Sequence, residues 1–409
     1  MSAVTQARPS HPSAHPAVGR PSAVDFHQAP FLVIWETTRS CGLACKHCRA
    51  DAMLRRDPLE LSTEEGKSLL DQVSAMGTPI CILSGGDPLN RQDLEVLISH
   101  GKRRGLRIGT IPAATENLTH DRVHRLKEAG LDQIAFSLDA PTAALHDAFR
   151  GVNGAFAKTM DGIASAHEVG LPVQINTCFA AWNVAYLDQM IALVQSLRVV
   201  FWEVFFLIPI GRGRDIQGLS AAHCHTIFEP LYRLGRDAPF IVKLTEAQHY
   251  RHFVRERESS TPEADSLRDT ATSPHLPVRY GGINDGLERL PQAVNAGKGL
   301  VFVDHVGNIA PSGFLPISVE NIRHCRLADT YQKSGVFRSL RNPKLLQGAC
   351  GTCALSSLCG GSRARAYATT GNYLAEDPFC ARVVAAPAPR TIRPISLIGS
   401  SQVNTKEVV

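Results

Sequence analysis

The sequence lacks any long apolar run: no stretch of its 409 residues reaches the roughly 18 apolar residues that a membrane span requires. Its N-terminus also lacks the apolar core of a secretory signal peptide. Its 43 Lys and Arg residues give a net charge of +5 but form no dense block, so a nucleic-acid-binding surface is not supported. We therefore expect a cytoplasmic protein whose partners include neither membrane nor nucleic acid.

Cysteine is scarce, with 11 residues in the chain, yet seven of them fall into two groups. Because cytoplasmic thiols are kept reduced, clustered cysteines more often bind metal than form disulfides. The first group, within "ETTRSCGLACKHCRAD", has Cys41, Cys45 and Cys48 in C-x-x-x-C-x-x-C spacing. Structural zinc usually takes four ligands, whereas three cysteines can hold three irons of a [4Fe–4S] cluster and leave the fourth iron open. The alternative is a set of buried structural cysteines.

The composition, 44% hydrophobic and 20% charged, is that of a globular protein with a full core. Residues 1–29 and 384–409 are rich in small residues and proline, without hydrophobic periodicity, and are predicted to be disordered. Between them, short apolar runs suited to a buried parallel sheet alternate with helix-like segments. The predicted strands are 31–38, 79–86, 106–113, 133–140, 172–179 and 199–209.

The segments between these strands carry helix signals. In the first, Ser62 stands three residues before Glu65 as a capping box, Leu69 and Val73 share one face, and Gly77 follows as a C-terminal signal. Six consecutive β-α units predict an α/β fold, a partial (βα)6 TIM-type barrel, with a small C-terminal iron–sulfur domain. In such a barrel the loops after the strands hold the site, and the first cysteine group follows the first strand.

The first cysteine group resembles the cluster motif of radical S-adenosylmethionine (SAM) enzymes, and the resemblance extends from about Phe31 to Cys380. It implies that Cys41, Cys45 and Cys48 bind a [4Fe–4S] cluster whose open iron is chelated by SAM. One electron then cleaves SAM to a 5′-deoxyadenosyl radical, so an electron donor such as flavodoxin or ferredoxin is expected.

The same resemblance implies contacts with SAM. The ring of His47 would pack near the adenine, and "SGGDPL" resembles the Gly-Gly-Glu segment that receives the SAM amino group, although alone it reads as a turn. Its glycines would let the backbone approach the ligand, Ser137 would be a polar contact, and Lys158 would meet the SAM carboxylate. The expected SAM contacts are His47, Gly85, Gly86, Asp87, Ser137 and Lys158.

Three further segments leave alternatives open. Asp139, Asp147 and Arg150 match a family stretch, but they are equally well explained as a structural network of caps and ion pairs. The family's Asn-Gly after the third strand is replaced by "PAATEN" (112–117). The loop "PIGRGR" (209–214) either contacts an anionic substrate or is a turn with solvated arginines.

The second group, Cys350, Cys353, Cys359 and Cys380, has C-x-x-C-x(5)-C-x(20)-C spacing and suits a second [4Fe–4S] cluster or zinc. It resembles the SPASM extension of radical SAM enzymes, whose further cysteine positions are represented here by non-cysteines. These include Ser312 and Arg363, so one auxiliary cluster is expected and not two.

The remaining cysteines have plainer explanations. Cys81 and Cys178 fall inside apolar strands and are expected to pack as small hydrophobic residues. Cys224 and Cys325 stand alone, with Cys325 as a candidate substitute ligand near the C-terminal group.

The expected layout is a barrel over 30–240, a substrate-side region over 241–345 and a SPASM-like domain over 346–383. The last domain most resembles the branch that makes d-type heme and heme by an alternative pathway, and this resemblance implies a tetrapyrrole substrate. A peptide-modifying maturase and a non-catalytic iron–sulfur sensor are the alternatives. Segments 245–251, 281–286 and 305–316 are expected to close the substrate side, with histidines that either bind iron or a propionate or are solvated.

Overall fold

The computed structural model describes residues 24–259 and 294–380. Most of the predicted disordered arm, the tail 384–409 and the expected substrate-side segment 281–286 lie outside these residues. Residues 24–29 of the predicted arm are ordered. Phe26 is buried beside Gly299, and the Tyr331 hydroxyl donates a hydrogen bond to the Phe26 carbonyl at 2.7 Å. Within the described residues, no helix combines the length and apolarity needed to cross a membrane.

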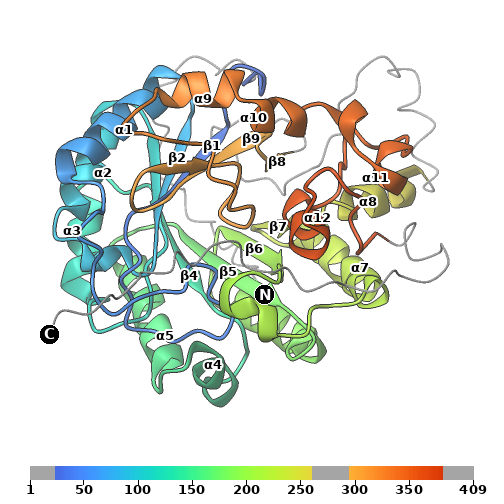
Figure 1. Ribbon diagram of the computed structural model, residues 1–409. Helices are drawn as coiled ribbons and strands as arrows, with labels where there is room; N and C mark the ends of the chain where they lie inside the picture. Colours follow the sequence, from blue (N-terminus) through green and yellow to red (C-terminus); the bar gives the residue numbers. More distant parts are fainter. Residues whose placement is uncertain (1–23, 260–293, 381–409) are drawn as a thin grey trace, which may run out of the picture.

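A parallel sheet forms the centre of the molecule (Figure 1), and all six predicted strands are present in it. Each pairs in parallel with the next along the chain. This order confirms the α/β fold and the partial TIM-type barrel. The six strands are β1 (Leu32–Glu36), β2 (Ile80–Ser84), β3 (Arg107–Thr110), β4 (Gln133–Ser137), β5 (Val173–Phe179) and β6 (Phe201–Phe206).

The sheet is wider than the predicted six strands. β7 (Ile241–Thr245) pairs in parallel with β6, and β9 (Gly299–Val303) pairs in parallel with β1 on its other side. Eight neighbouring parallel strands therefore run from β9 through β1 to β7. Three short strands extend the β9 side: β8 (Asn295–Ala296), β10 (Asn308–Ala310) and β11 (Glu320–Asn321).

Helices cover the outer face of the sheet (Figure 1). The predicted capping box at the first helix is confirmed, because the Ser62 hydroxyl accepts from Glu65 N and the Glu65 carboxylate accepts from Ser62 N. The helices are α1 (Thr63–Ala75), α2 (Leu94–Arg103), α3 (His120–Glu128), α4 (Ala143–Arg150), α5 (Ala155–Glu168), α6 (Leu187–Ser196), α7 (Ala221–Asp237), α8 (Tyr250–Ser259), α9 (Leu327–Lys333), α10 (Gly335–Leu340), α11 (Gly348–Gly351) and α12 (Arg363–Thr370).

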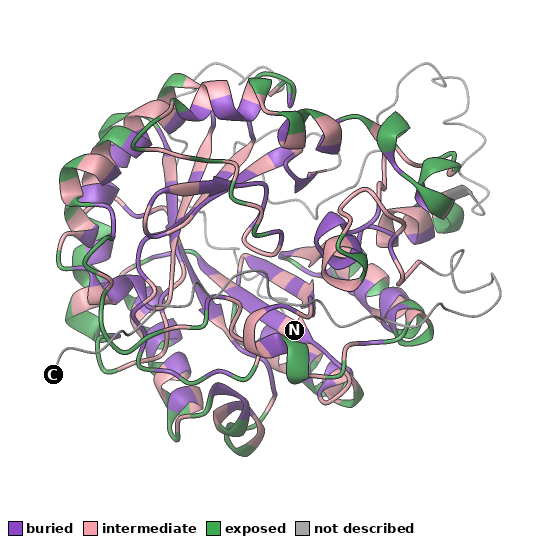
Figure 2. Cartoon of the chain, in the orientation of Figure 1, coloured by how far each residue is buried: buried purple, intermediate pink, exposed green. Residues whose placement is uncertain are grey.

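Strand side chains alternate between a helix-facing core and the barrel interior. The core cluster includes Val173, Ile175 and Phe179 of β5, and the strands are largely buried (Figure 2). Cys81 lies in this core, as expected, and is fully buried. Cys178 does not: next to Phe179 in the strand, it faces the interior and is only partly buried, because adjacent residues point to opposite faces.

Where β5, β6 and β7 adjoin, the barrel interior carries a polar network. The Gln174 amide donates to Asn176 at 2.7 Å and to Glu203 at 3.1 Å. The Glu203 carboxylate also accepts from Lys243 at 2.7 Å and Thr245 at 2.6 Å. A polar interior lined by facing strands is typical of a barrel that takes a polar ligand, not of one closed by its own core.

Candidate active site and cysteine pocket

The first cysteine group lies on the loop that follows β1, at the carboxyl end of the sheet. Cys41 and Cys45 are buried and Cys48 is partly buried. Burial, together with the nearby Asp87, Cys45 and Cys48, raises the pKa of the Cys41 thiol to about 12. Three thiols this close can be deprotonated together only beside positive charge, and the irons of a cluster would supply it. The loop therefore fits a [4Fe–4S] cluster.

The glycines after β2 bring that strand directly against the cysteine loop. Gly86 N donates to Thr38 O and Asp87 N donates to Ser40 O, both at 2.7 Å. A Cβ atom on Gly86 would lie 2.5 Å from Ser40 O, so only glycine permits this contact. The expected reason for these glycines was close approach to a ligand, whereas the structure shows close approach to the chain itself.

Asp87 is fully buried between loops. Its carboxylate accepts from Leu89 N at 3.1 Å, Ala113 N at 3.3 Å and the Thr115 hydroxyl at 2.5 Å. Burial raises the pKa of this carboxyl despite these bonds. The segment 112–117, which replaces the family's Asn-Gly, is thus hydrogen-bonded to the Gly-Gly-Asp turn through the Asp87 carboxylate.

Asp139, in the loop after β4, and Asp147 and Arg150, in α4, form the structural network that the sequence left as one alternative. Arg150 makes a buried ion pair with Asp139, which also accepts from Cys178 N at 2.8 Å. Asp147 accepts from Gly154 N and Phe156 N at the start of α5. In addition, the Arg150 guanidinium reaches the Cys45 sulfur at 3.6 Å, so this network touches the cysteine loop.

His47 belongs to an aromatic stack beside the cysteines. Its ring lies 4.6 Å from that of Phe149 at 12°, and Phe149 stacks on Trp182 at 4.3 Å. Burial lowers the pKa of His47 to about 4, so the ring is neutral near pH 7. Its Nδ1 and the Trp182 Nε1 are buried without a hydrogen-bond partner in the described part of the chain.

The "PIGRGR" loop packs on the cysteine loop. Arg212 N donates to Cys48 O at 3.0 Å, and its Nε donates to Cys45 O at 2.9 Å. Gly211 has φ of +51°, and a Cβ there would lie 2.4 Å from Cys48 O. Arg212 is therefore bound to the backbone of the cysteine loop and is not a solvated arginine, whereas contact of this loop with an anionic substrate stays a prediction.

The two remaining expected SAM contacts differ in position. Ser137 ends β4 on its interior side, opposite Asn176 of β5, at the sheet edge that bears the cysteine loop. Lys158 lies on α5 in the outer layer, and its Nζ is 2.8 Å from the exposed Glu116. The structure thus brings Ser137 to the barrel mouth and places Lys158 in a surface ion pair.

A charged cluster stands at the adjoining ends of β1 and β9. Glu36 lies 2.7 Å from the Arg49 guanidinium and 3.2 Å from His305 Nδ1, and His305 Nε2 is 3.4 Å from Asp57. Burial lowers the pKa of His305, but pairing with Glu36 outweighs this and raises it overall. His305 is therefore buried and not solvated, whereas binding of iron or a propionate by this histidine stays a prediction.

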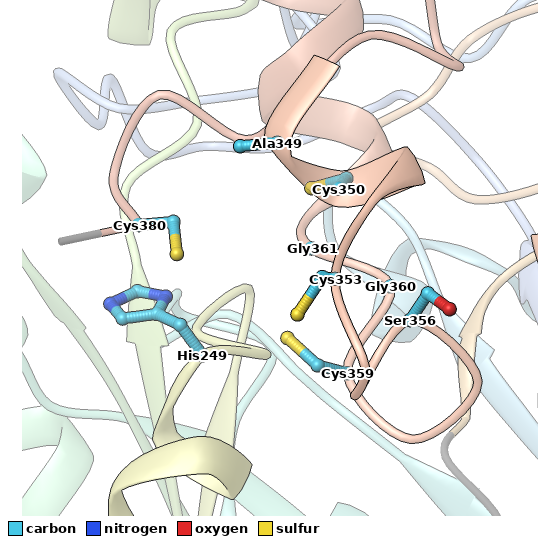
Figure 3. A pocket seen from close by; sticks show the side chains of 9 residues that line it. All are labelled: His249, Ala349, Cys350, Cys353, Ser356, Cys359, Gly360, Gly361 and Cys380. Atoms are coloured by element: carbon cyan, nitrogen blue, oxygen red, sulfur yellow. The ribbon is translucent and has the colours of Figure 1, made fainter. Parts of the chain in front are cut away.

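The second cysteine group forms one pocket. Cys350, Cys353, Cys359 and Cys380 line it together with His249 (Figure 3), around an empty volume of about 380 Å³ that is partly open to solvent. Burial raises the pKa of Cys359 to about 11. The Cys350 sulfur accepts from Asp377 N at 3.4 Å. Four thiols facing one space fit a four-ligand metal group.

The positions that replace further SPASM cysteines have structural roles. The Arg363 guanidinium donates to Tyr373 O and Ala375 O at 2.9 and 2.6 Å, and it reaches the Cys350 sulfur at 3.6 Å. The Ser312 hydroxyl accepts from Phe314 N at 3.1 Å.

The two single cysteines lie outside both groups. Cys224 is fully buried in α7. The Cys325 sulfur lies 3.2 Å from Asn321 O and 3.1 Å from the Thr330 hydroxyl, away from the cysteine pocket, so its expected role as a substitute ligand is wrong. Across the described ranges, no three His, Cys, Asp or Glu side chains converge tightly enough for a single metal ion. The fit to clusters rests on thiol number, spacing and the shared pocket.

Comparison with known proteins identifies the family. Residues 35–194 match the Radical SAM superfamily. The AdoMet-dependent heme synthase of Nitratidesulfovibrio vulgaris strain Hildenborough is 35% identical over 373 residues, which cover 91% of this chain and 96% of that protein. The chain belongs to the radical SAM superfamily. The pre-heme d1 synthase of Dinoroseobacter shibae is 28% identical over 355 residues, covering 85% of each protein, which fits the heme-biosynthesis branch.

The fold of this radical SAM enzyme also matches a solved structure, Streptococcus suis SuiB bound to its precursor peptide SuiA. The TM-score is 0.65 at 16% identity, covering 87% of this chain and 76% of that one. The family uses SAM and a [4Fe–4S] cluster, so the protein is an enzyme that cleaves SAM reductively. The alternative of a non-catalytic iron–sulfur sensor is thereby excluded.

Proposed function

We propose that this enzyme oxidatively modifies the carboxylate-bearing side chains of a tetrapyrrole in heme-type cofactor biosynthesis. The observation that carries the proposal is the 35% identity to a heme synthase over nearly the full length of both proteins. In the structure, the cysteine loop follows β1 and the cysteine pocket borders the segment after β7. Because β1 and β7 are strands of one parallel sheet, both groups lie at the same end of the barrel.

We assign the SAM-binding [4Fe–4S] cluster to the loop after β1, where this group when bound supplies the electron that cleaves SAM. Arg150 and Arg212 hold the loop in place from two sides. The SAM contacts are proposed to be His47 through its stack, Ser137 at the strand end, and the turn organised by Asp87. The proposed cluster ligands are Cys41, Cys45 and Cys48, and the proposed SAM contacts are His47, Gly85, Gly86, Asp87, Ser137 and Lys158, the last of which would have to leave its ion pair with Glu116.

A fixed cation at the barrel mouth suits an anionic substrate. Arg39 and Arg49 lie beside Glu36, and His305 lies between Glu36 and Asp57. The Arg49 guanidinium also lies 4.6 Å above the Phe302 ring of β9. A flat, carboxylate-bearing molecule meets an aromatic face and a fixed cation here.

We assign a second [4Fe–4S] cluster, and not zinc, to Cys350, Cys353, Cys359 and Cys380. An oxidative reaction started by a radical must pass on an electron, and zinc has no accessible redox change. A cluster at the same end of the barrel as the SAM site can accept this electron. A cytoplasmic flavodoxin or ferredoxin is proposed as the physiological donor.

The test is turnover by the anaerobically reconstituted, reduced enzyme with SAM, comparing a propionate-bearing iron porphyrin with a peptide substrate. The proposal expects 5′-deoxyadenosine formation coupled to a mass change of the porphyrin. Replacing Cys41, Cys45 and Cys48 together by Ala should abolish both, whereas replacing the core Cys81 by Ala should abolish neither. The fold similarity to SuiB keeps a peptide maturase as the second candidate, and modification of peptide but not porphyrin would establish it.

A further inference from the structure

His249 is a buried side chain whose polar atoms have no partner. It lies between β7 and α8, directly before the first residue of α8, and is only 9% exposed. Within the described part of the chain, neither Nδ1 nor Nε2 has a hydrogen-bond partner. Leaving a buried polar group unpaired costs free energy, so each such group in a native structure calls for an explanation.

The imidazole faces the cysteine pocket. Figure 3 shows it beside Cys380, across the pocket from Cys353 and Cys359. A further neighbour is the Phe228 ring, whose centroid lies 4.9 Å away and offers no conventional acceptor. The nearby Asp377 carboxylate already accepts from Ser362 N, Phe379 N and Arg365. Most of the remaining pocket lining is Ala and Gly. The sulfur atoms are therefore the main acceptors within this space.

The turn that carries His249 is fixed by the C-terminal domain. Glu246 has φ of +60°, a left-handed conformation that non-glycine residues adopt only when their surroundings impose it. Its carbonyl accepts from Arg365, and its carboxylate accepts from the Ser362 hydroxyl, both at 2.5 Å. Arg365 is itself paired with the fully buried Asp377. The strained turn thus holds the imidazole against the pocket.

We propose that His249 donates an N–H hydrogen bond to a sulfur of the auxiliary cluster, which is held by four thiolates. This inference rests on the proposed assignment of that cluster. Four cysteines already supply one ligand for each of four irons, so the imidazole is left as a donor and not a ligand. It lies across the pocket from Cys350 (Figure 3), whose sulfur is reached by the Asp377 N–H and the Arg363 guanidinium.

Donors to cluster sulfur atoms stabilise the reduced, more negatively charged state and raise the reduction potential. His249 therefore makes the auxiliary cluster a better electron acceptor. This suits a cluster that must take an electron from an oxidative reaction and does not itself bind SAM.

The experiment uses full-length protein in which Cys41, Cys45 and Cys48 are replaced by Ala, so that the auxiliary cluster alone remains. Pulsed EPR of the reduced cluster, in protein labelled with ¹⁵N-histidine, should show a weak nitrogen coupling. His249→Phe should abolish that coupling and shift the potential to a more negative value, with iron content unchanged. His252→Phe, a control three residues away whose ring pairs with Glu256 outside the pocket, should change neither.

A strong coupling of a directly bound nitrogen, with loss of iron in His249→Phe, would overturn the donor role in favour of ligation. No histidine coupling in the labelled protein would overturn it as well, and this result needs no His249 variant. A protein without any iron–sulfur signal in this background would overturn the cluster assignment itself. The two failures can be told apart. A missing cluster removes the EPR signal even when His249 is intact and unlabelled, whereas a wrong donor role leaves the signal and removes only the nitrogen coupling.

Discussion

Arg150 places its guanidinium 3.6 Å from the Cys45 sulfur while it is ion-paired with the buried Asp139. The cysteine loop after β1 is thus joined electrostatically to the loop after β4. The backbone follows the same connection, because Ala44 N donates to Arg150 O at 3.1 Å and Lys46 N donates to Phe149 O at 3.0 Å. The loop that would bear the SAM cluster is therefore held by α4 through both charge and backbone hydrogen bonds.

Arg150→Met should lower the free energy of unfolding of the metal-free protein by about 3–5 kcal/mol, because it leaves Asp139 charged, buried and unpaired. Lys158→Met is the matched control, since its pair with Glu116 is largely exposed and contributes about 0–1 kcal/mol. Denaturant titration measures both. Equal losses in the two variants would contradict the role given to the buried pair.

Gly211→Ala should displace the cysteine loop, because its new Cβ would lie 2.4 Å from Cys48 O. The protein should bind fewer irons at this site and form less 5′-deoxyadenosine. Gly105→Ala is the control: its φ is +81° but no atom lies within 4 Å, so only backbone strain of about 1–2 kcal/mol is added. Iron analysis after anaerobic reconstitution compares the two variants. Equal iron contents would contradict the role of Gly211 in positioning the cysteine loop.

Asp87→Ala should lower the stability of the protein even without SAM. The change removes the acceptor for Leu89 N, Ala113 N and the Thr115 hydroxyl, and the buried donors left behind cost about 1–3 kcal/mol. Denaturation without SAM and SAM-binding titration together separate two roles. A loss of SAM affinity with unchanged stability would make Asp87 a direct ligand contact and not an organiser of the turn.

Anaerobically reconstituted protein should carry about eight irons per chain, in two [4Fe–4S] clusters. Replacing Cys350, Cys353, Cys359 and Cys380 together by Ala should leave about four irons, with SAM cleavage partly retained and product formation lost. Replacing Cys224 and Cys325 is the control and should leave the iron content unchanged. About four irons and one zinc in the wild-type protein would show that the pocket is structural.

His305 should contribute to stability in a pH-dependent way. Its pKa is raised in the folded protein through pairing with Glu36, against the effect of burial. The folded state therefore binds the proton more tightly, and the contribution is fully present below about pH 6.5 and is lost as the pH rises through the raised pKa. The stability difference between wild type and His305→Gln should shrink from pH 6 to pH 9. A difference that grows over this range would contradict the pairing.

The sequence was informative wherever the signal was local. Apolar runs bounded by breakers located β1 to β6, and Ser62 with Glu65 located the start of α1. β9 was missed although "GLVFV" is a short apolar run, because its pairing with β1 joins residues far apart in the chain. β7 was missed because Lys243 and Thr245, which belong to the interior network, interrupt its apolar pattern.

At the candidate site, residue type and spacing were enough to single out both cysteine groups. Residue type and spacing could not show which other side chains contact the cysteine groups or what those side chains do there. Arg212 looked like a solvated or substrate-binding arginine, and only the fold shows that it holds two carbonyls of the cysteine loop. His249 falls within the expected substrate-side segment 245–251, but no local signal links it to cysteines more than 100 residues away.

The place of β1 inside the sheet has a consequence for the growing chain. Its neighbour β2 follows after about 45 residues, but its other neighbour, β9, begins only at Gly299. While the ribosome synthesises the residues between them, the outer edge of β1 offers unpaired backbone groups to any other strand. Nascent chains or truncated products that end before Gly299 therefore present the strand that leads into the cysteine loop as an aggregation edge, which only completion of the C-terminal part can cover.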